Sequence, residues 1–512
     1  MGKSRTQKSI KNAKVALLFY AIYFAIQFFS RKVFIDYLGA EILGLNTTIA
    51  NMLSFLNIAE LGIASAISYV LYKPLHNNDQ NTIKEIISIQ GWIYRKVTLF
   101  VCIITGVILC FIPFIFRKTD IPLVFIYSTF LVSVTGIILS YLFNYTQILF
   151  VADQKEYKIN IVNQGFRILK IFCQVIAIIY LEDGYIYWLI LEFVFTIVSA
   201  YFLRKVLKDH YPWLKLELKK GKFFNEKYPE ILKKTKQLFV HQISQFILNQ
   251  VTPLIIFSYL SLTMVAIYGN YMLIVNGIVL FINAMFSGAQ AGIGNMVAEG
   301  NKSKIIDFFG EFAVLKYWMI SIICFVLFLQ TQAFVSLWVG EKYLLSVTEL
   351  YLLIIYLFIL ITRVTDGFIY AYGLFNDVFA QIFEVILSIT LSLFLGKYWG
   401  LSGILFGVVS SQFLLMMCWK PFFLFTKGFK INFGVYIKKV IIYFLCIIIS
   451  FFVSLRLFNI IVFHANNNFL FWIINSLIAL IIYFGVSFFV FSLTSKDFKK
   501  IYSRFKLIFV KR

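Results

Sequence analysis

Fourteen apolar stretches, each about as long as a helix that crosses a lipid bilayer, occupy most of this 512-residue chain. The sequence is 61% hydrophobic and only 14% charged, whereas a soluble domain is about 45–50% apolar and about 25% charged. An open sheet cannot satisfy its backbone in lipid, and the alternating pattern of a barrel is absent. The sequence therefore predicts an all-α membrane protein of about 14 transmembrane helices, near residues 15–35, 44–71, 97–117, 121–150, 166–182, 185–203, 237–260, 262–290, 305–330, 347–374, 378–396, 401–425, 438–462 and 468–492.

Basic residues are divided unevenly between the two sides of this predicted bundle. With the amino terminus inside, the inner segments and the tail contain 38 Lys and Arg, and the outer connections contain 6. Because basic residues accumulate in cytoplasmic loops, both termini are expected in the cytoplasm. The same bias accounts for most of the net charge of +23 as a basic face near anionic lipid headgroups, so no nucleic-acid partner is predicted.

The longest hydrophilic segment divides the stretches into six before it and eight after it. An even number of crossings in each half gives two repeats of the same orientation, related by an axis along the membrane normal. We therefore expect an N-lobe in residues 1–203, a basic cytoplasmic linker in 204–236, a C-lobe in 237–427, and two further helices with a basic tail in 428–512.

Three of the predicted helices carry polar residues on one face. In 44–71 these residues fall within about half of the helix circumference, and in 237–260 and 262–290 within about 100° of arc. Each residue alone is better explained by hydrogen bonding between helices. The three stripes together favour a water-filled cavity, with polar lining candidates Asn46, Asn51, Asn57, His241, Gln245, Asn249, Asn276 and Asn283.

Ionisable residues inside the stretches are a sharper signal, because each costs at least about 2.5–3.5 kcal/mol at the bilayer centre. Arg31 and Lys316 have no evident counter-ion at helical spacing, so with Arg363 they are candidates for the phosphate of an anionic substrate. Arg363 and Asp366 are three residues apart and can instead neutralise each other. Glu60 and Asp366 are the candidates for coupling transport to protons or cations.

Motifs of soluble enzymes are missing from the sequence, including the Walker-type loop, the Gly-x-Ser-x-Gly elbow and His-Glu-x-x-His. The six cysteines lie in apolar stretches without metal-ligand spacing. We therefore expect no catalytic residue, no cofactor and no metal. Energy for transport would come from an ion gradient, the membrane potential or the substrate gradient.

Three segments carry a family resemblance. Residues 33–75 read VFIDYLGAEILGLNTTIANMLSFLNIAELGIASAISYVLYKPL. This resembles the first two helices of bacterial polysaccharide exporters, the Wzx-type O-antigen flippases of the multidrug, oligosaccharidyl-lipid and polysaccharide exporter superfamily. The segments VAIYGNYMLIVNGI at 265–278 and FVSLWVGEKYL at 334–344 are similar to the same family. In length and helix count the likeness extends over the whole chain.

The resemblance implies two six-helix lobes around a central cavity, plus two carboxy-terminal helices. Alternating access would carry an undecaprenyl-pyrophosphate-linked oligosaccharide from the cytoplasmic to the outer leaflet of the bacterial cytoplasmic (inner) membrane, for O-antigen, lipopolysaccharide or capsule synthesis. Implied partners are this lipid, the surrounding membrane lipids, and the polysaccharide polymerase and chain-length machinery. Relatives bind the phosphates with basic cavity residues; Arg31 fits that role by position, and Lys316 and Arg363 fit by depth.

Other functions remain open. A multidrug or cation antiporter of the same superfamily would need unpaired acids, which Glu60, Glu192 and Glu384 can supply. A membrane glycan polymerase or acyltransferase normally presents large outer loops, whereas the longest outer connection here has about 16 residues. A purely structural scaffold is disfavoured, because charge inside a membrane is normally retained for a task.

Overall fold

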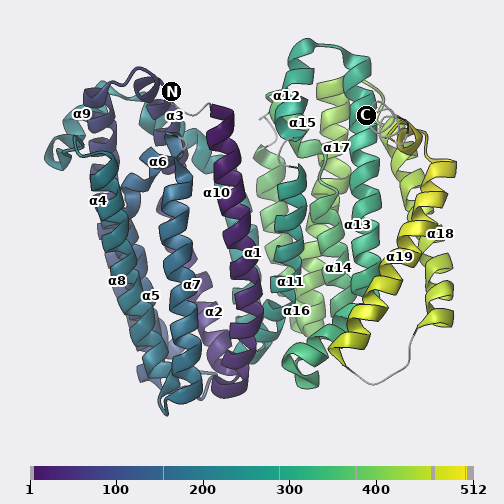
Figure 1. The fold of residues 1–512 in the computed structure, drawn as a ribbon, viewed down its shortest axis with the longest axis horizontal. Coiled ribbons are helices and arrows are strands. Elements are labelled where there is room, and N and C mark those ends of the chain that lie inside the picture. The colour runs from purple at the N-terminus through teal and green to yellow at the C-terminus, as the bar shows by residue number, and fades with distance from the viewer. Residues whose placement is uncertain are drawn as a thin grey trace. The chain divides into compact units, whose positions relative to one another are not determined.

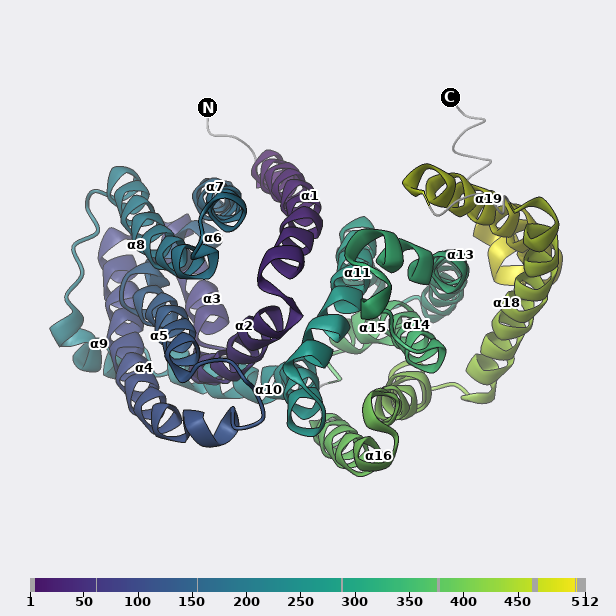
Figure 2. The same ribbon diagram turned by 90° about the horizontal axis from the view of Figure 1, so that it is seen from below.

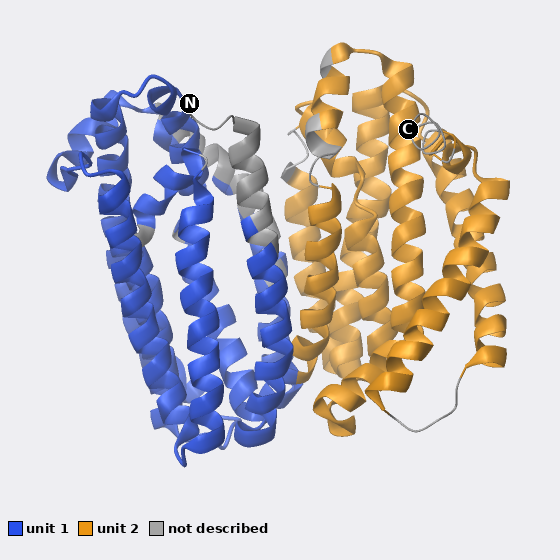
Figure 3. Ribbon diagram, viewed as in Figure 1, with its two compact units in different colours: residues 1–266 blue, residues 267–512 orange. Residues whose placement is uncertain are grey.

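The computed structural model describes residues 5–60, 62–153, 155–286, 289–374, 378–462, 468–501 and 503, apart from some side chains within helices, most of them in α1 and α10. All regular elements of these residues are helices. The chain divides into two compact units, residues 1–266 and 267–512 (Figure 3). Each unit has its own hydrophobic core and its own charged residues.

Unit 1 contains long helices joined by short connections (Figure 1). Its helices are α1 (Arg5–Leu38), α2 (Ala40–Ser54), η1 (Phe55–Glu60), α3 (Ile63–His76), α4 (Gln80–Ile115), α5 (Leu123–Leu139), η2 (Ser140–Asn144), η3 (Tyr145–Gln147), α6 (Ile148–Ala152), α7 (Glu156–Tyr180), α8 (Gly184–His210), η4 (Leu218–Lys220), α9 (Gly221–Lys227) and α10 (Glu230–Tyr259). The unit ends inside α11 (Leu262–Phe286).

Unit 2 takes in the rest of α11 and the helices that follow it. These are α12 (Ala289–Glu299), α13 (Lys302–Val339), η5 (Glu341–Tyr343), α14 (Val347–Ile361), α15 (Thr365–Ala371), α16 (Val378–Gln412), η6 (Phe413–Trp419), α17 (Lys420–Phe423), η7 (Leu424–Phe429), α18 (Gly434–Ile461) and α19 (Phe469–Thr494).

The helices confirm an all-α, multi-pass membrane protein. Eleven of them in the described residues are long and apolar enough to cross a membrane, and the bent pair Ala40–Ile58 with Ile63–His76 makes twelve. The fourteen predicted stretches also include α10, and they count as two the single 51-residue stretch Phe379–Phe429. Large apolar side chains such as Phe379 and Ile460 are 80% exposed, as expected of a surface that faces lipid.

The second predicted stretch is broken instead of continuous. α2 and η1 lead to Glu60, α3 starts at Ile63, and the two halves are bent by 50°. Gly62 has a φ of +86°, a left-handed conformation that glycine adopts without a steric penalty. The break therefore places Glu60 at the end of a helical segment inside the span.

The Phe379–Phe429 stretch is a helical hairpin, because Gly400 interrupts α16 with a φ of 57° and a ψ of −133°. Ser392 Oγ donates a hydrogen bond to the carbonyl of Ile404 across the two arms, at 3.0 Å. A Cβ on Gly407 would lie only 2.5 Å from the backbone nitrogen of Ser392. The arms thus meet at backbone distance, as small residues permit between helices in membranes. The hairpin corresponds to the two separate spans that the sequence predicts at 378–396 and 401–425.

The core of unit 1 joins α1, α7 and α8, which lie side by side (Figure 2). Its buried residues are Val33, Phe34, Ile171, Val175, Ile178, Tyr185 and Leu189. In unit 2 the two carboxy-terminal helices, α18 and α19, pack on α13 through Phe325, Phe458, Ala479 and Tyr483. Lipid tails are as apolar as these side chains, so close packing and hydrogen bonds, rather than escape from water, hold such helices together.

The two compact units differ in extent from the two lobes that the sequence predicts. α10, predicted as the first helix of the C-lobe, packs on α2 and α3 within unit 1. The predicted lobes describe an internal repeat, which is a different property from compactness, so their boundaries stay a prediction.

Candidate functional site

A polar cavity of about 200 Å³ lies within unit 1, between α1, α2, α7 and α8. We call it the unit 1 cavity. Three cationic side chains and one acidic side chain line it, which leaves an excess of two positive charges. Its lining residues are Tyr23, Gln27, Ser30, Arg31, Phe34, Leu43, Asn46, Arg167, Lys170, Ile171, Gln174, Val175, Ile178, Trp188 and Glu192.

Arg31, the first phosphate candidate from the sequence, lines this cavity from α1. Its Nη2 donates a hydrogen bond to the carbonyl oxygen of Ala266 at 3.1 Å. This bond fixes the guanidinium at the cavity wall. Val33 and Phe34, which follow it in α1, are buried in the core of unit 1 and anchor that turn of the helix.

An ion pair crosses from α7 to α8 at the cavity. Lys170 Nζ lies 2.6 Å from Glu192 Oε1, and Gln174 Nε2 donates to Glu192 Oε2 at 3.0 Å. Each carboxylate oxygen of Glu192 therefore already accepts a hydrogen bond. The sequence suggested Glu192 as an unpaired acid for a cationic substrate. In the structure, Glu192 is paired.

Arg167 contributes a further cation, which forms no ion pair with an acid among the described residues. Its guanidinium carbon lies 3.9 Å from the centre of the Tyr23 ring, a distance at which a cation and an aromatic face attract each other. No ion pair between described residues includes Arg167. A planar guanidinium held against a ring presents its N–H groups in a fixed orientation, which suits phosphate recognition.

The charge pattern of the sequence places Arg167 and Lys170 with an inner connection, whereas both lie in α7. α7 begins at Glu156, so Arg167 is eleven residues, or about 16 Å, into the helix. Spacing alone gives a signal for this face: Arg167, Lys170 and Gln174 follow an i, i+3, i+7 pattern, which puts them on one side of a helix.

Two further cavities, of about 510 and 240 Å³, meet at Glu60 in unit 1. Tyr94 donates a hydrogen bond to Glu60 Oε1 at 2.7 Å, and Tyr141 donates to Asn57 Oδ1 at 2.7 Å. The carboxyl group thus lies at the helix break, in contact with both a tyrosine and open polar space. This surrounding is compatible with the coupling role predicted from the sequence, which stays a prediction.

The polar stripe of the second stretch does not point into one cavity. Asn46 lines the unit 1 cavity and accepts a hydrogen bond from Tyr185 at 3.1 Å, whereas Asn57 lines the cavity at Glu60. Asn51 donates to the carbonyl of Thr47 on its own helix at 2.7 Å. The stripe is therefore divided between two cavities and a local backbone contact.

The other predicted stripes are described only in part. His241, Gln245 and Asn249 belong to α10, but their side chains lie outside the described residues. Asn276 and Asn283 are exposed on α11. Their cavity-lining role remains a prediction.

Charged residues of unit 2 form a cluster of ion pairs. Arg363 Nη2 lies 2.9 Å from Asp366 Oδ2, as their spacing of three residues predicts, and Lys420 Nζ lies 2.6 Å from Asp366 Oδ1. Lys420, which the sequence places with an inner loop, is 5% exposed. Two cations therefore share one acid, and Arg363 is engaged within the protein.

Lys316, the remaining phosphate candidate, lies on α13 and makes no ion pair with another described residue. Its Nζ is 5.4 Å from the centre of the Phe286 ring and 5.2 Å from that of Phe312. The ammonium group thus lies near two aromatic rings.

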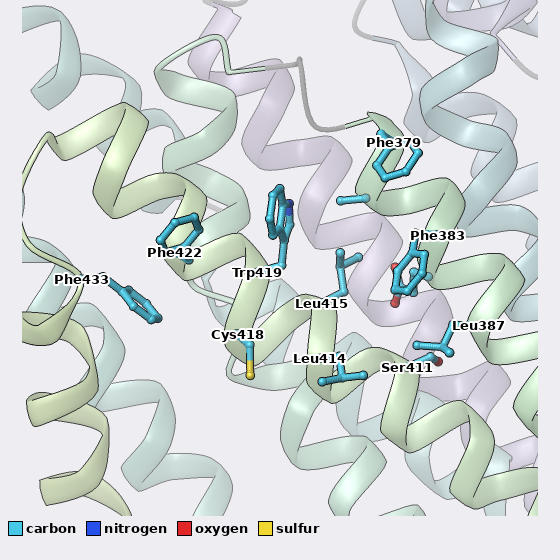
Figure 4. A pocket seen from close by; sticks show the side chains of 12 residues that line it. Phe379, Phe383, Leu387, Ser411, Leu414, Leu415, Cys418, Trp419, Phe422 and Phe433 are labelled. Atoms are coloured by element: carbon cyan, nitrogen blue, oxygen red, sulfur yellow. The ribbon is translucent and has the colours of Figure 1, made fainter.

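Unit 2 also contains an apolar groove of about 530 Å³ between the two arms of the hairpin (Figure 4). We call it the aromatic groove; Phe379, Ala380, Phe383, Glu384, Leu387, Ser411, Leu414, Leu415, Cys418, Trp419, Phe422 and Phe433 line it. Glu384 is 1% exposed, and neither of its carboxylate oxygens has a hydrogen-bond partner in the described part of the protein. Burial of a carboxyl group without a partner is costly, which marks Glu384 as unusual.

No group of three or more His, Cys, Asp or Glu side chains that could hold a metal ion occurs among the described residues.

Comparison with known proteins identifies the fold through similarity to solved structures. No family model and no curated protein matches the sequence. Among solved structures, "Lipid II flippase MurJ, inward closed conformation" is similar with a TM-score of 0.66 and 14% identity, over 93% of this chain and 99% of that one. An inward-facing "multidrug resistance MATE family transporter of the MOP superfamily" is similar with a TM-score of 0.59 and 14% identity, over 80% and 96%. A MOP superfamily transporter from Pyrococcus furiosus has a TM-score of 0.50 and 12% identity, over 83% and 96%. At such identities the likeness shows that this chain has the fold of MOP superfamily transporters.

Proposed function

We propose that this protein is a flippase that moves a lipid-linked oligosaccharide across the bilayer, with a pyrophosphate-bearing headgroup carried through the protein and the polyprenyl tail left in lipid. The unit 1 cavity is the observation that carries the proposal. Arg31, Arg167 and Lys170 line it against the single acid Glu192, which already pairs with Lys170.

The charge excess matches the chemistry of such a substrate. A pyrophosphate with about two negative charges cannot enter hydrocarbon unaided, because removing even one ion from water is prohibitively costly. Guanidinium groups form bidentate, charge-assisted hydrogen bonds with phosphate oxygens. An inside-negative potential favours outward movement of the anion by about 2.3 kcal/mol per charge per 100 mV. No bound nucleotide is needed for that step.

The size of the unit 1 cavity limits what it holds. Its volume of about 200 Å³ leaves room for a pyrophosphate group. The amide and hydroxyl groups of Gln27, Ser30 and Asn46 at its wall can exchange hydrogen bonds with the first sugar at little net cost.

Transport by purified protein tests the proposal. Proteoliposomes would contain a fluorescent polyprenyl-pyrophosphate oligosaccharide, and the fraction protected from an external reagent would be followed over time. We expect transport by the parent chain and a loss of at least tenfold in Arg167→Gln. Arg456→Gln, which removes an exposed arginine of α18, is the matched control. Transport equal in all three proteins, or absent from the parent, would contradict the proposal.

The physiological setting that we propose is a bacterial cytoplasmic membrane with both termini in the cytoplasm. A deletion strain should accumulate lipid-linked repeat units on the cytoplasmic leaflet. Reporter fusions at residue 1 and residue 512 should both report a cytoplasmic location. An outer location for either terminus would contradict the orientation without affecting the substrate.

A second function is favoured by the aromatic groove, namely transport of amphiphilic organic cations. Glu384 is buried beside Phe379, Phe383 and Trp419 without a hydrogen-bond partner in the described residues. Aromatic faces and an acid are the groups that attract such cations. Efflux of a fluorescent lipophilic cation that depends on Glu384 but not on Arg167 would favour this function over the flippase.

A further inference from the structure

The linker between α8 and α10 contains a folded element that the functions above do not use. Residues 215–227, which include η4 and α9, lie against the first turns of α4; we call this segment the linker foot. The backbone N–H of Glu217 donates to Ser88 Oγ at 3.0 Å, and the Glu217 carboxylate pairs with Lys84 of α4. Lys227 pairs with Glu85 of α4 at 2.7 Å. The foot is therefore attached to α4 at both of its ends.

Packing between these ion pairs is close. A Cβ on Gly221 would lie 2.2 Å from the Cβ of Trp92, so only a glycine fits against that ring. Phe224 is 8% exposed, whereas Phe223, the next residue back, is 68% exposed. Phe224 thus packs the linker foot against the rest of unit 1, whereas the side chain of Phe223 is exposed.

The depth of the foot follows from its partner on α4. The apolar run of α4 begins at about Val97, five residues or about 7.5 Å beyond Trp92 along the helix. Lys96 Nζ lies 3.9 Å from the centre of the Trp92 ring. Tryptophan and lysine at the end of a span are typical of the membrane–water interface. Gly221, and with it α9, therefore lies at the level of the lipid headgroups.

The exposed side of the foot is basic. The segment contains five lysines and two glutamates, a net charge of +3. Lys215, Lys219, Lys220, Lys222 and Lys227 are all exposed. Lys220 and Lys227 hold the ion pairs with Glu217 and Glu85, and no ion pair between described residues includes Lys219 or Lys222. Figure 2 shows α9 at the periphery of unit 1, beside α4.

We propose that the linker foot binds the anionic phospholipid surface on the side of the membrane where α1 begins, with Phe223 inserted among the headgroups and Lys219 and Lys222 beside lipid phosphates. An apolar side chain ringed by lysines at headgroup depth is the arrangement that binds anionic interfaces. The proposal is more specific than a general excess of basic residues on one side of the membrane. The close contact at Gly221 and the ion pairs of Glu217 and Lys227 with α4 hold in place the segment that carries Phe223, Lys219 and Lys222. The surface is independent of the unit 1 cavity and of the transported substrate.

Lipid titration of the purified full chain tests the charge. The apparent affinity for phosphatidylglycerol would be measured by native mass spectrometry, with phosphatidylcholine as the neutral comparison. Each lysine near an anionic surface contributes about a fivefold change in affinity, so the double variant Lys219→Gln/Lys222→Gln should lose roughly 25-fold. Lys496→Gln/Lys499→Gln, which removes two exposed lysines after α19, is the matched control and should lose much less.

Insertion of Phe223 has its own measurement. Tryptophan fluorescence of Phe223→Trp in proteoliposomes, after subtraction of the parent signal, should be quenched by lipids brominated near the headgroup. Affinity equal to that of the parent in Lys219→Gln/Lys222→Gln, or no quenching of Phe223→Trp, would overturn the proposal. Inorganic phosphate should not compete with phosphatidylglycerol for the linker foot. Equal apparent affinities for the two would also overturn the proposal, because they would indicate an ion site instead of a membrane surface. Size-exclusion chromatography confirms that each variant is folded.

Discussion

The charged residues of the two units are organised in opposite ways. In unit 2, the two cations Arg363 and Lys420 both pair with the single acid Asp366. In unit 1, three cations line a cavity with a single acid. Cations that share an acid are largely neutralised within the protein, whereas an excess of like charge around a cavity in a membrane needs water or an anionic ligand. The count of buried charges therefore says less about a site than their pairing does.

Asp366→Ala should have the largest effect, and on stability. The substitution leaves Arg363 and Lys420 without their shared acid, and loss of one partner of a buried pair costs about 3–5 kcal/mol. We expect a clearly lower thermal midpoint in detergent, measured with a thiol-reactive or intrinsic fluorescence probe. A midpoint unchanged from the parent would show that the unit 2 cluster is not structural, and the contrast with unit 1 would fail.

Arg167→Ala should reduce transport with little change in stability. A hydrogen bond to a charged group contributes about 1.5–3 kcal/mol, which corresponds to a loss of roughly 10- to 100-fold in transport of the lipid-linked substrate. Arg31→Ala and Lys316→Ala test the other candidates in the same assay. Normal rates in Arg31→Ala and Lys316→Ala, at matched protein levels, would remove those two residues as phosphate ligands.

Glu60→Gln should change how transport responds to pH by a few-fold. The carboxyl group accepts a hydrogen bond from Tyr94 between two cavities, and glutamine keeps the shape while it loses the titratable proton. In Glu60→Gln, the transport rate measured in proteoliposomes should vary less with pH than it does in the parent. If parent and variant respond identically, Glu60 does not couple transport to protons.

Glu217 should give the smallest effect, confined to the linker foot. Hydrogen bonds from Lys220 and Lys84 lower the pKa of its carboxyl group to about 2. A lowered pKa means that the contribution to docking is complete above the ordinary pKa of about 4.5 and is lost as the pH falls toward 2. The protection of residues 215–227 against hydrogen exchange, measured relative to an unstructured chain at the same pH, should therefore fall on acidification in the parent. In Glu217→Gln this protection should be low at every pH, and a protection profile equal to that of the parent would show that the Glu217 carboxylate does not hold the linker foot on α4.

The sequence predicts the helices well, because apolar length is a strong and local signal. Each predicted stretch overlaps at least one helix of the described residues, although 44–71 and 347–374 are divided between successive helices. The pair of Arg363 and Asp366 was also predictable from their spacing of three residues, although Arg363 lies in the break between α14 and α15. The partnership of Asp366 with Lys420 joins residues 54 apart in the sequence, and no local pattern reports it.

The unit 1 cavity was only partly predictable for the same reason. Arg31 stands out within an apolar stretch, whereas Arg167 and Lys170 lie at the start of the predicted stretch 166–182 and were counted with the basic residues of an inner connection. The length of α7, which begins at Glu156, places both residues well inside the helix. The divided polar stripe is a similar case, because the bend at Gly62 and the backbone bond of Asn51 redirect side chains that a straight helix would align.

The hairpin at Gly400 has a mechanical consequence. Its arms touch through backbone atoms at Gly407, and Ser392 forms a hydrogen bond between them, so sliding of one arm past the other would break both contacts. We therefore expect the two arms to move together in any rearrangement of unit 2. Bending of the chain is expected instead where a helix is already broken, as it is beside Glu60.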